Sequence, residues 1–186
     1  PNNLHTHIEL GFHKRIWDAV PGDNSVTFSL EDEDGYLGFP GHKKVSVTYF
    51  LDEENALRLH YHASSDKRTI FNLTNHSYFN LDGDPSKDNS DYLLTLNADY
   101  YTPVDSTFMT TGEILPVEGT PMDFRCPTAI GVRINQNFEQ LKNGNGIDHN
   151  WILNTKGDIQ QVCATLESSV TGIVLDVYTD EPGIQA

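Results

Sequence analysis

The stretch Ser25-Val26-Thr27-Phe28-Ser29-Leu30 alternates polar and apolar side chains, and Lys44-Val45-Ser46-Val47-Thr48-Tyr49-Phe50-Leu51 alternates again. Alternation with a period of two is typical of a half-buried β-strand. The acidic, glycine-containing stretch 31–41 between them is expected to be a loop. A third strand is predicted over residues 56–62, after a turn at 52–55. These spacings favour hairpins of a sandwich or barrel.

Turns separate further short runs of β-branched and aromatic residues along the rest of the chain. Strands are predicted for residues 68–74, 92–96, 100–104, 113–117, 151–153, 162–166 and 173–178. Only residues 130–141 have the pattern of a helix, and the polar stretch 81–91 is expected to be a loop. Neither an internal repeat nor a domain linker is visible. We therefore expect residues 1–186 to belong to a single all-β domain, a large antiparallel β-sandwich.

The composition is strongly acidic, with 27 Asp and Glu residues against 12 Lys and Arg and a formal net charge of −15. Such a surface repels phosphate backbones and anionic lipids, so neither nucleic acid nor a membrane is an expected partner. A neutral small molecule would meet no such barrier. No apolar run is long enough to span a bilayer and no signal peptide is visible, which favours a cytoplasmic location.

Neither the cysteines nor the paired histidines predict a metal or cofactor site. Cys126 and Cys163 form no zinc motif or disulfide framework, so we expect two free thiols in a reducing cytosol. His60 and His62 share one face of a predicted strand, and apolar residues alternate with them. We expect this pair to point to water, since a metal site usually needs at least three protein ligands.

The densest group of polar and aromatic residues is Asn72-Leu73-Thr74-Asn75-His76-Ser77-Tyr78-Phe79-Asn80-Leu81, at the end of a predicted strand. The unperturbed pKa of histidine lies near neutrality, so His76 is a candidate acid or base. Tyr78 offers a flat apolar face with a polar tip, which suits a sugar ring. The alternative is structural, with His76 buried and hydrogen-bonded by neighbouring Asn and Ser groups.

Two further segments carry candidate binding residues. Asp148 follows the glycine-rich turn Asn143-Gly144-Asn145-Gly146 and precedes Trp151. Its carboxylate can accept hydrogen bonds from two sugar hydroxyls, with Trp151 as a stacking surface. The alternative for Asp148 is a turn residue that bonds its own backbone. His5, near the chain start, is the third candidate, and its alternative is a solvated terminal tail.

The segment 72–81 closely resembles the signature of the aldose 1-epimerases, also called galactose mutarotases. Other motifs occur in the family's order, and together they cover essentially the whole chain. They are Leu4-His5, Gly11-Phe12-His13-Lys14-Arg15-Ile16-Trp17, Gly38-Phe39-Pro40-Gly41, Tyr101-Thr102-Pro103-Val104-Asp105, Gly119-Thr120-Pro121-Met122-Asp123-Phe124-Arg125, Gly146-Ile147-Asp148-His149-Asn150-Trp151 and Thr179-Asp180-Glu181-Pro182-Gly183-Ile184-Gln185. The resemblance implies a large β-sandwich.

The resemblance also implies an activity and the residues that carry it. Such enzymes interconvert the α and β anomers of a free aldose, galactose or glucose, and use no cofactor. His76 is implied as the general acid that protonates the ring oxygen, and His5 as a second active-site histidine that holds sugar oxygens. The implied substrate contacts are Ser77, Tyr78, Asp148 and Gln185.

The sequence departs from the family pattern in two respects. Thr6-His7 stand where the family usually has two glycines, so we expect the close backbone approach that those glycines allow to be lost. The family's general base is a glutamate in a strand beyond the motif that ends at Gln185, and Glu181 does not match it. An early segment with a substrate-contacting arginine is also absent. We therefore expect residues 1–186 to be the central portion of the domain, incomplete at both termini and impaired on its own.

Two other functions remain open at this point. The same scaffold can serve as a non-catalytic carbohydrate-binding module. A sugar-phosphate epimerase or glycosidase-associated relative should show basic pocket residues or paired carboxylates. Among the family motifs that follow residue 17, Arg125 is the only arginine, and we expect it to form a structural ion pair. Motifs of nucleotide-binding proteins and serine hydrolases are absent, and the sequence does not indicate the oligomeric state.

Overall fold

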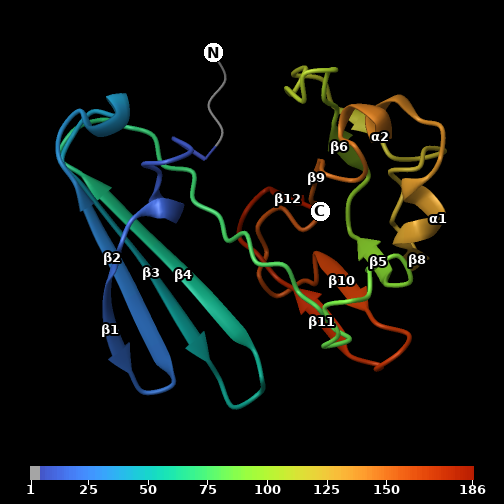
Figure 1. The fold of residues 1–186 in the computed structure, drawn as a ribbon, viewed down its shortest axis with the longest axis horizontal. Coiled ribbons are helices and arrows are strands. Elements are labelled where there is room, and N and C mark those ends of the chain that lie inside the picture. Colours follow the sequence, from blue (N-terminus) through green and yellow to red (C-terminus); the bar gives the residue numbers. More distant parts are fainter. Residues whose placement is uncertain (1–4) are drawn as a thin grey trace. The chain divides into compact units, whose positions relative to one another are not determined.

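The chain divides into two compact units in a computed structural model that describes residues 5–186. The first unit ends at Ser77 and the second begins at Tyr78. Each unit has its own β-sheets (Figure 1). The expectation that residues 1–186 belong to one domain stays a prediction.

One antiparallel sheet forms the body of the first unit, with strand order β1-β2-β3-β4. The strands are β1 Asp18–Gly22, β2 Ser25–Asp32, β3 Lys43–Leu51 and β4 Leu57–Ser65. Two 3₁₀ helices accompany them, η1 Phe12–Lys14 and η2 Tyr36–Gly38. The last three strands confirm the hairpins predicted from the alternating pattern.

The register of this sheet separates a polar face from an apolar one. Thr27 of β2 pairs with Thr48 of β3, which pairs with His60 of β4, and the two threonine hydroxyls lie 2.8 Å apart. On the opposite face, the rings of Phe28 and Tyr49 meet edge to face with centroids 6.0 Å apart. His60 is exposed to solvent, as is His62, so the predicted outward direction of this pair is confirmed.

The second unit contains two four-stranded antiparallel sheets, ordered β11-β10-β5-β8 and β12-β9-β6-β7. Their strands are β5 Leu93–Leu96, β6 Tyr100–Thr102, β7 Leu115–Pro116, β8 Thr128–Ala129, β9 Asn150–Ile152, β10 Ala164–Glu167, β11 Val174–Val177 and β12 Gly183–Gln185. Two short helices, α1 Ile130–Ile134 and α2 Glu139–Asn143, lie between β8 and β9 in the sequence.

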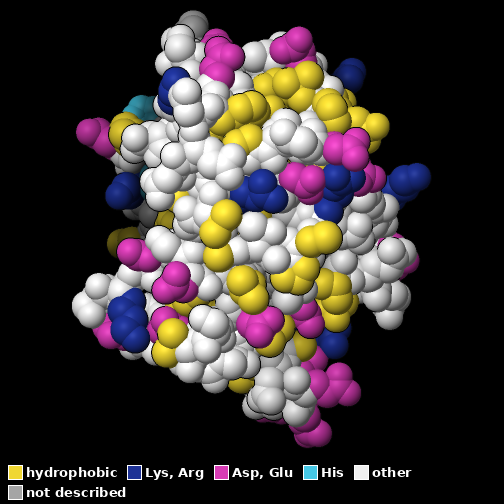
Figure 2. All heavy atoms as spheres, turned by 90° about the vertical axis from the view of Figure 1, so that its right-hand side faces the viewer, with side chains coloured by type: hydrophobic (Ala, Val, Ile, Leu, Met, Phe, Trp, Pro, Cys, Tyr) yellow, Lys and Arg dark blue, Asp and Glu magenta, His cyan; other side chains and the backbone are white. Residues whose placement is uncertain are grey.

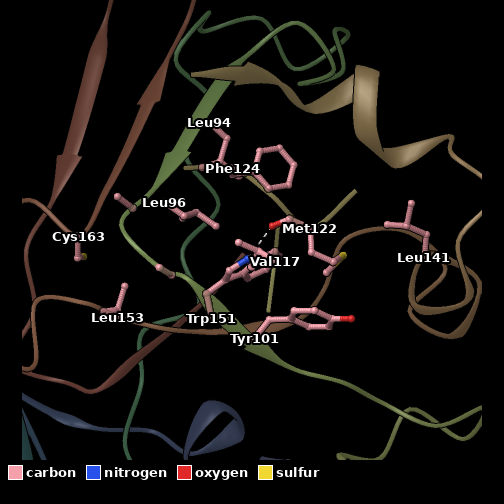
Figure 3. Packing of buried hydrophobic residues seen from close by; sticks show 12 residues of the cluster. Leu94, Leu96, Tyr101, Val117, Met122, Phe124, Leu141, Trp151, Leu153 and Cys163 are labelled. Carbon is pink, nitrogen blue, oxygen red and sulfur yellow. Dashed lines mark hydrogen bonds between the residues drawn. The ribbon is translucent and has the colours of Figure 1, made fainter. Parts of the chain in front are cut away.

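The core of the second unit draws side chains from both of its sheets (Figure 3). Leu96 comes from β5, whereas Tyr101 and Trp151 come from β6 and β9. Trp151 is fully buried, and its indole N–H donates a 3.0 Å hydrogen bond to the carbonyl oxygen of Met122. This bond satisfies the one polar atom of the side chain inside an apolar cluster. The predicted antiparallel β-sandwich is therefore confirmed.

Two predicted elements are wrong. Residues 68–74 were expected to form a strand, but the structure describes all of them without assigning a strand there. A segment whose residues favour an extended backbone forms a β-strand only when another strand pairs with it. The helix expected over residues 130–141 is broken between α1 and α2. There the Phe138 N–H bonds to the Gln136 carbonyl, and the stretch contains Asn135 and Asn137, a residue type that is unfavourable inside helices.

Several short elements were not predicted. Strand β1 contains Pro21 and Gly22, which are depleted in strands, but β1 lies at an edge of its sheet where proline is tolerated. Strands β8 and β12 are too short to show a pattern. The predicted loop 31–41 is shorter than expected, because β2 continues to Asp32 and η2 occupies part of it.

Candidate active site

His76 lies in the extended segment that follows β4 in the first unit, and its side chain is exposed. The ring of His5 contacts it edge to face, with ring centroids 5.6 Å apart. Within residues 5–186, His76 is therefore not buried, as the structural alternative required. An exposed imidazole beside a second imidazole can donate a proton to a bound molecule or accept one from it.

The segment that carries His76 is held by the side chain of Asn75. The Asn75 amide donates a 2.8 Å hydrogen bond to the phenol oxygen of Tyr49 on β3. The side-chain oxygen of Asn75, Oδ1, accepts a hydrogen bond from the backbone N–H of Ser77 at 3.0 Å. Asn75 thus fixes the backbone on both sides of His76. Its residue type and position alone did not mark Asn75 as a supporting residue, although it stands inside the signature segment.

His5 lies in a compact turn close to the chain start. Its carbonyl oxygen accepts the backbone N–H of His7 at 2.8 Å, and its ring contacts that of His13 with centroids 6.2 Å apart. A Cβ atom added at Gly11 would lie only 2.6 Å from the His5 carbonyl oxygen, so the turn requires glycine there. These contacts contradict a purely solvated tail, although the His5 side chain itself is exposed.

The two residues that replace or precede the family's glycines have unusual backbone angles. His5 has a φ of 52° and Thr6 a φ of 68°, both in the left-handed region. Glycine adopts this region without steric cost, whereas a β-branched residue does not. The turn therefore keeps a glycine-like conformation at Thr6 despite the substitution.

Arg15 anchors the segment that follows this turn to the first sheet. Its guanidinium forms a 2.6 Å ion pair with the nearly buried Asp32 of β2 and lies over the ring of Tyr36, 4.9 Å from the centroid. The hydrogen bond to Asp32 raises the pKa of Arg15 above its ordinary value. The Tyr36 hydroxyl in turn donates to the Leu10 carbonyl at 3.2 Å. Together these bonds fasten the N-terminal segment within the first unit.

In the second unit, Asp148 and Gln185 are brought together. The Gln185 amide donates a 2.6 Å hydrogen bond to Oδ1 of Asp148, and both side chains are exposed. Strand pairing explains this contact, because β12 pairs with β9 and sets Gln185 opposite Asn150. Asp148 therefore makes a long-range contact, which disfavours the simple turn-residue alternative. A carboxylate oriented by an amide can accept hydrogen bonds from a polyhydroxyl ligand.

The candidate residues thus form two groups, one in each unit. His5, His76 and Ser77 belong to the first unit, whereas Asp148 and Gln185 belong to the second. Tyr78 begins the second unit, and its side chain is 89% exposed. Trp151 is fully buried in the core, so the suggestion that it stacks on a sugar is wrong.

Arg125, the candidate for a basic pocket residue, is paired with an acidic side chain. Arg125 binds the Asp123 carboxylate through Nε at 2.9 Å and through Nη2 at 2.8 Å, which lowers the pKa of Asp123. The expected structural ion pair is confirmed. Figure 2 shows acidic side chains spread over the face drawn there, with basic side chains and hydrophobic patches between them. Within residues 5–186, no group of three or more His, Cys, Asp or Glu side chains is arranged to hold a metal ion.

The fold is that of the galactose mutarotase-like β-sandwiches. A galactose 1-epimerase structure from Lactobacillus acidophilus matches 96% of this chain and 53% of its own, with a TM-score of 0.84 and 37% identity. An aldose epimerase homologue from C. elegans matches the whole chain and 56% of its own, with a TM-score of 0.81 and 30% identity.

Residues 1–186 match the family model described as Aldose 1-epimerase, and the chain belongs to this family. It is 44% identical to human galactose mutarotase over 186 residues, which is 100% of this chain and 52% of that protein. It is 39% identical to the aldose 1-epimerase of Escherichia coli K12 over 185 residues, 99% of this chain and 53% of that protein. The chain therefore spans about half the length of these relatives. None of the helices described here has the length and apolar character needed to cross a membrane.

Proposed function

We propose that the protein carrying this chain is an aldose 1-epimerase that interconverts the α and β anomers of galactose or glucose. The observation that carries the proposal is the exposed imidazole of His76 beside that of His5, on a chain of this family. The acidic surface favours a neutral substrate over an anionic one. No cofactor takes part in the proposed reaction.

In the proposed reaction, His76 acts as the general acid. A base removes the proton of the anomeric hydroxyl, the bond between the anomeric carbon and the ring oxygen breaks, and the His76 imidazolium protonates that oxygen. The aldehyde end of the open chain rotates. Closure in the reverse sense returns the proton to His76 and gives the other anomer. Each such acid or base is typically worth about 10²–10⁴-fold in rate.

The other candidate residues bind and orient the sugar in this proposal. His5 holds sugar oxygens beside His76, and Ser77 and Tyr78 flank the acid. Because Gln185 already occupies Oδ1 of Asp148, we assign the hydroxyl contacts chiefly to the other carboxylate oxygen. A fixed carboxylate reduces the entropy that is lost when the sugar binds.

The general base is not assigned to a described residue. Following the family resemblance, we propose that it is a glutamate C-terminal to Gln185 and outside these 186 residues. The 186-residue chain alone should then bind sugar and turn it over slowly.

Polarimetry and calorimetry together test the proposed function. Freshly dissolved α-galactose and α-glucose are followed by polarimetry with the full-length protein, and binding is measured by titration calorimetry. Turnover well above the spontaneous rate is expected for at least one of the two sugars. Binding without turnover would instead favour a carbohydrate-binding module, and neither binding nor turnover would contradict both functions.

A further inference from the structure

His149 is a buried polar residue beside a candidate sugar-binding residue, and its role is unassigned. It directly follows Asp148 and is only 1% exposed. Three aromatic rings surround it edge to face, Tyr101 and Phe108 with centroids at 6.2 and 6.4 Å and Trp151 at 6.4 Å. An apolar side chain would fill such a site at lower cost, so the imidazole calls for an explanation.

A hydrogen bond of the imidazole links it to the preceding residue, Asp148. Nδ1 of His149 accepts the backbone N–H of Asp148 at 3.3 Å. An accepting Nδ1 places the proton of the neutral ring on Nε2, and within residues 5–186 this buried Nε2 has no hydrogen-bonding partner. The ring therefore keeps an unsatisfied group in the core while it holds the backbone of Asp148.

The backbone of His149 ties the same region to the strand that carries Gln185. The His149 N–H donates to the Ala186 carbonyl at 3.3 Å, and the Ala186 N–H donates back to the His149 carbonyl at 3.2 Å. These two bonds extend the pairing of β9 with β12 by one residue pair. His149 is thus bonded to Asp148 through its side chain and to Ala186, the residue next to Gln185, through its backbone.

Space for the imidazole depends on a glycine at the end of α2. A Cβ atom added at Gly144 would lie 2.8 Å from Cε1 of His149. The φ of Gly144 is −83°, outside the left-handed region, so the main effect of an alanine there is close contact: its Cβ would crowd the imidazole and would also lie 3.0 Å from the Gly146 carbonyl oxygen. Gly144→Ala is therefore a way to displace the ring without altering His149 itself.

We propose that His149 is a positioning residue for sugar binding, whose neutral imidazole holds the Asp148 backbone so that the carboxylate stays paired with Gln185. The inference rests on the proposed function of Asp148 as a sugar ligand. It predicts that sugar binding depends on whether residue 149 has a hydrogen-bond acceptor at the Nδ1 position. A side chain that only fills the same space should not be enough.

The first test compares His149→Leu, which lacks the acceptor, with His149→Asn, whose Oδ1 can replace Nδ1. In the full-length protein, His149→Leu should raise KM for galactose about five- to tenfold with kcat changed less than about twofold, as expected for one lost hydrogen bond. His149→Asn should recover most of this loss. Equal KM values for wild type and His149→Leu, or equal impairment of both folded variants, would overturn the proposal.

Two further variants separate positioning from general destabilisation. Gly144→Ala should raise KM in the same direction as His149→Leu. Thr155→Val is the matched control, because Thr155 is also buried in this unit and its hydroxyl has no hydrogen-bond partner among residues 5–186. It should leave KM unchanged, and a rise equal to that of His149→Leu would mean that replacing any buried polar side chain of this unit has this effect.

A second readout does not depend on activity. Amide hydrogen exchange at Asp148, measured on the full-length protein, should accelerate about fivefold in His149→Leu and return towards wild type in His149→Asn. If galactose and glucose both fail as substrates while exchange follows this pattern, the proposed function is wrong but the link from His149 to Asp148 stands. Unchanged exchange in His149→Leu would reject the link itself.

Discussion

Gln185 donates its side-chain amide to Oδ1 of Asp148 across 2.6 Å, although 37 residues separate the two in the sequence. If this pair binds sugar hydroxyls, Asp148→Asn should raise KM for galactose about tenfold or more, because hydrogen bonds to a charged group are worth about 1.5–3 kcal/mol. Initial polarimetric rates over a range of galactose concentrations would measure it. Asp158→Asn is the control, since Asp158 bonds to Gln161 in the same way at 2.7 Å. Equal effects of both substitutions would contradict the assignment.

Phe124 should be essential to the stability of the second unit. It is 1% exposed and meets the ring of Trp151 with centroids 6.2 Å apart. Phe124→Ala should lower the free energy of unfolding by about 3–5 kcal/mol, through lost burial and the cavity left behind. Val174→Ala, at a residue 51% exposed, should cost less than about 1 kcal/mol. Urea unfolding curves would compare them, and similar midpoints for both variants would contradict the described core.

His149 should make the stability of the fold depend on pH. Burial lowers its pKa below the ordinary value of 6.5, and the Asp148 carboxylate opposes this only in part. As the pH falls through about 6.5, the unfolded chain binds a proton at this residue before the folded chain does, so the free energy of unfolding falls. His149→Asn removes this contribution. The difference in the free energy of unfolding between wild type and His149→Asn should therefore shrink from pH 7.5 to pH 5.5. Urea midpoints measured across this pH range would test it, and a difference that does not change with pH would refute it.

The fold was predictable where side chains alternate over a long strand. Strands β2 and β3 followed directly from the alternation that begins at Ser25 and at Lys44. Residues 68–74 have the same local preferences but form no strand, because a ladder needs a partner that local sequence does not specify. Strand β1 was missed because Pro21 is unfavourable in most strands, although proline is tolerated in an edge strand such as β1.

The candidate site was only partly predictable. The residue types alone marked His76 and Asp148, but nothing in the spacing shows that Gln185 reaches Asp148, since this depends on the register of β12 against β9. His149 was missed because a buried histidine has no periodic signature. Its position between Asp148 and an apolar strand, five residues after Gly144, was the only available signal.

The most direct test of the account is the rate of anomer exchange with His76 replaced. In the full-length protein, His76→Asn should lower the polarimetric kcat for galactose by about 10²–10⁴-fold, the usual contribution of a general acid. His60→Asn, at an exposed histidine on β4, serves as the matched control and should keep the wild-type rate. A His76→Asn protein that folds and exchanges anomers at the wild-type rate would contradict the central claim.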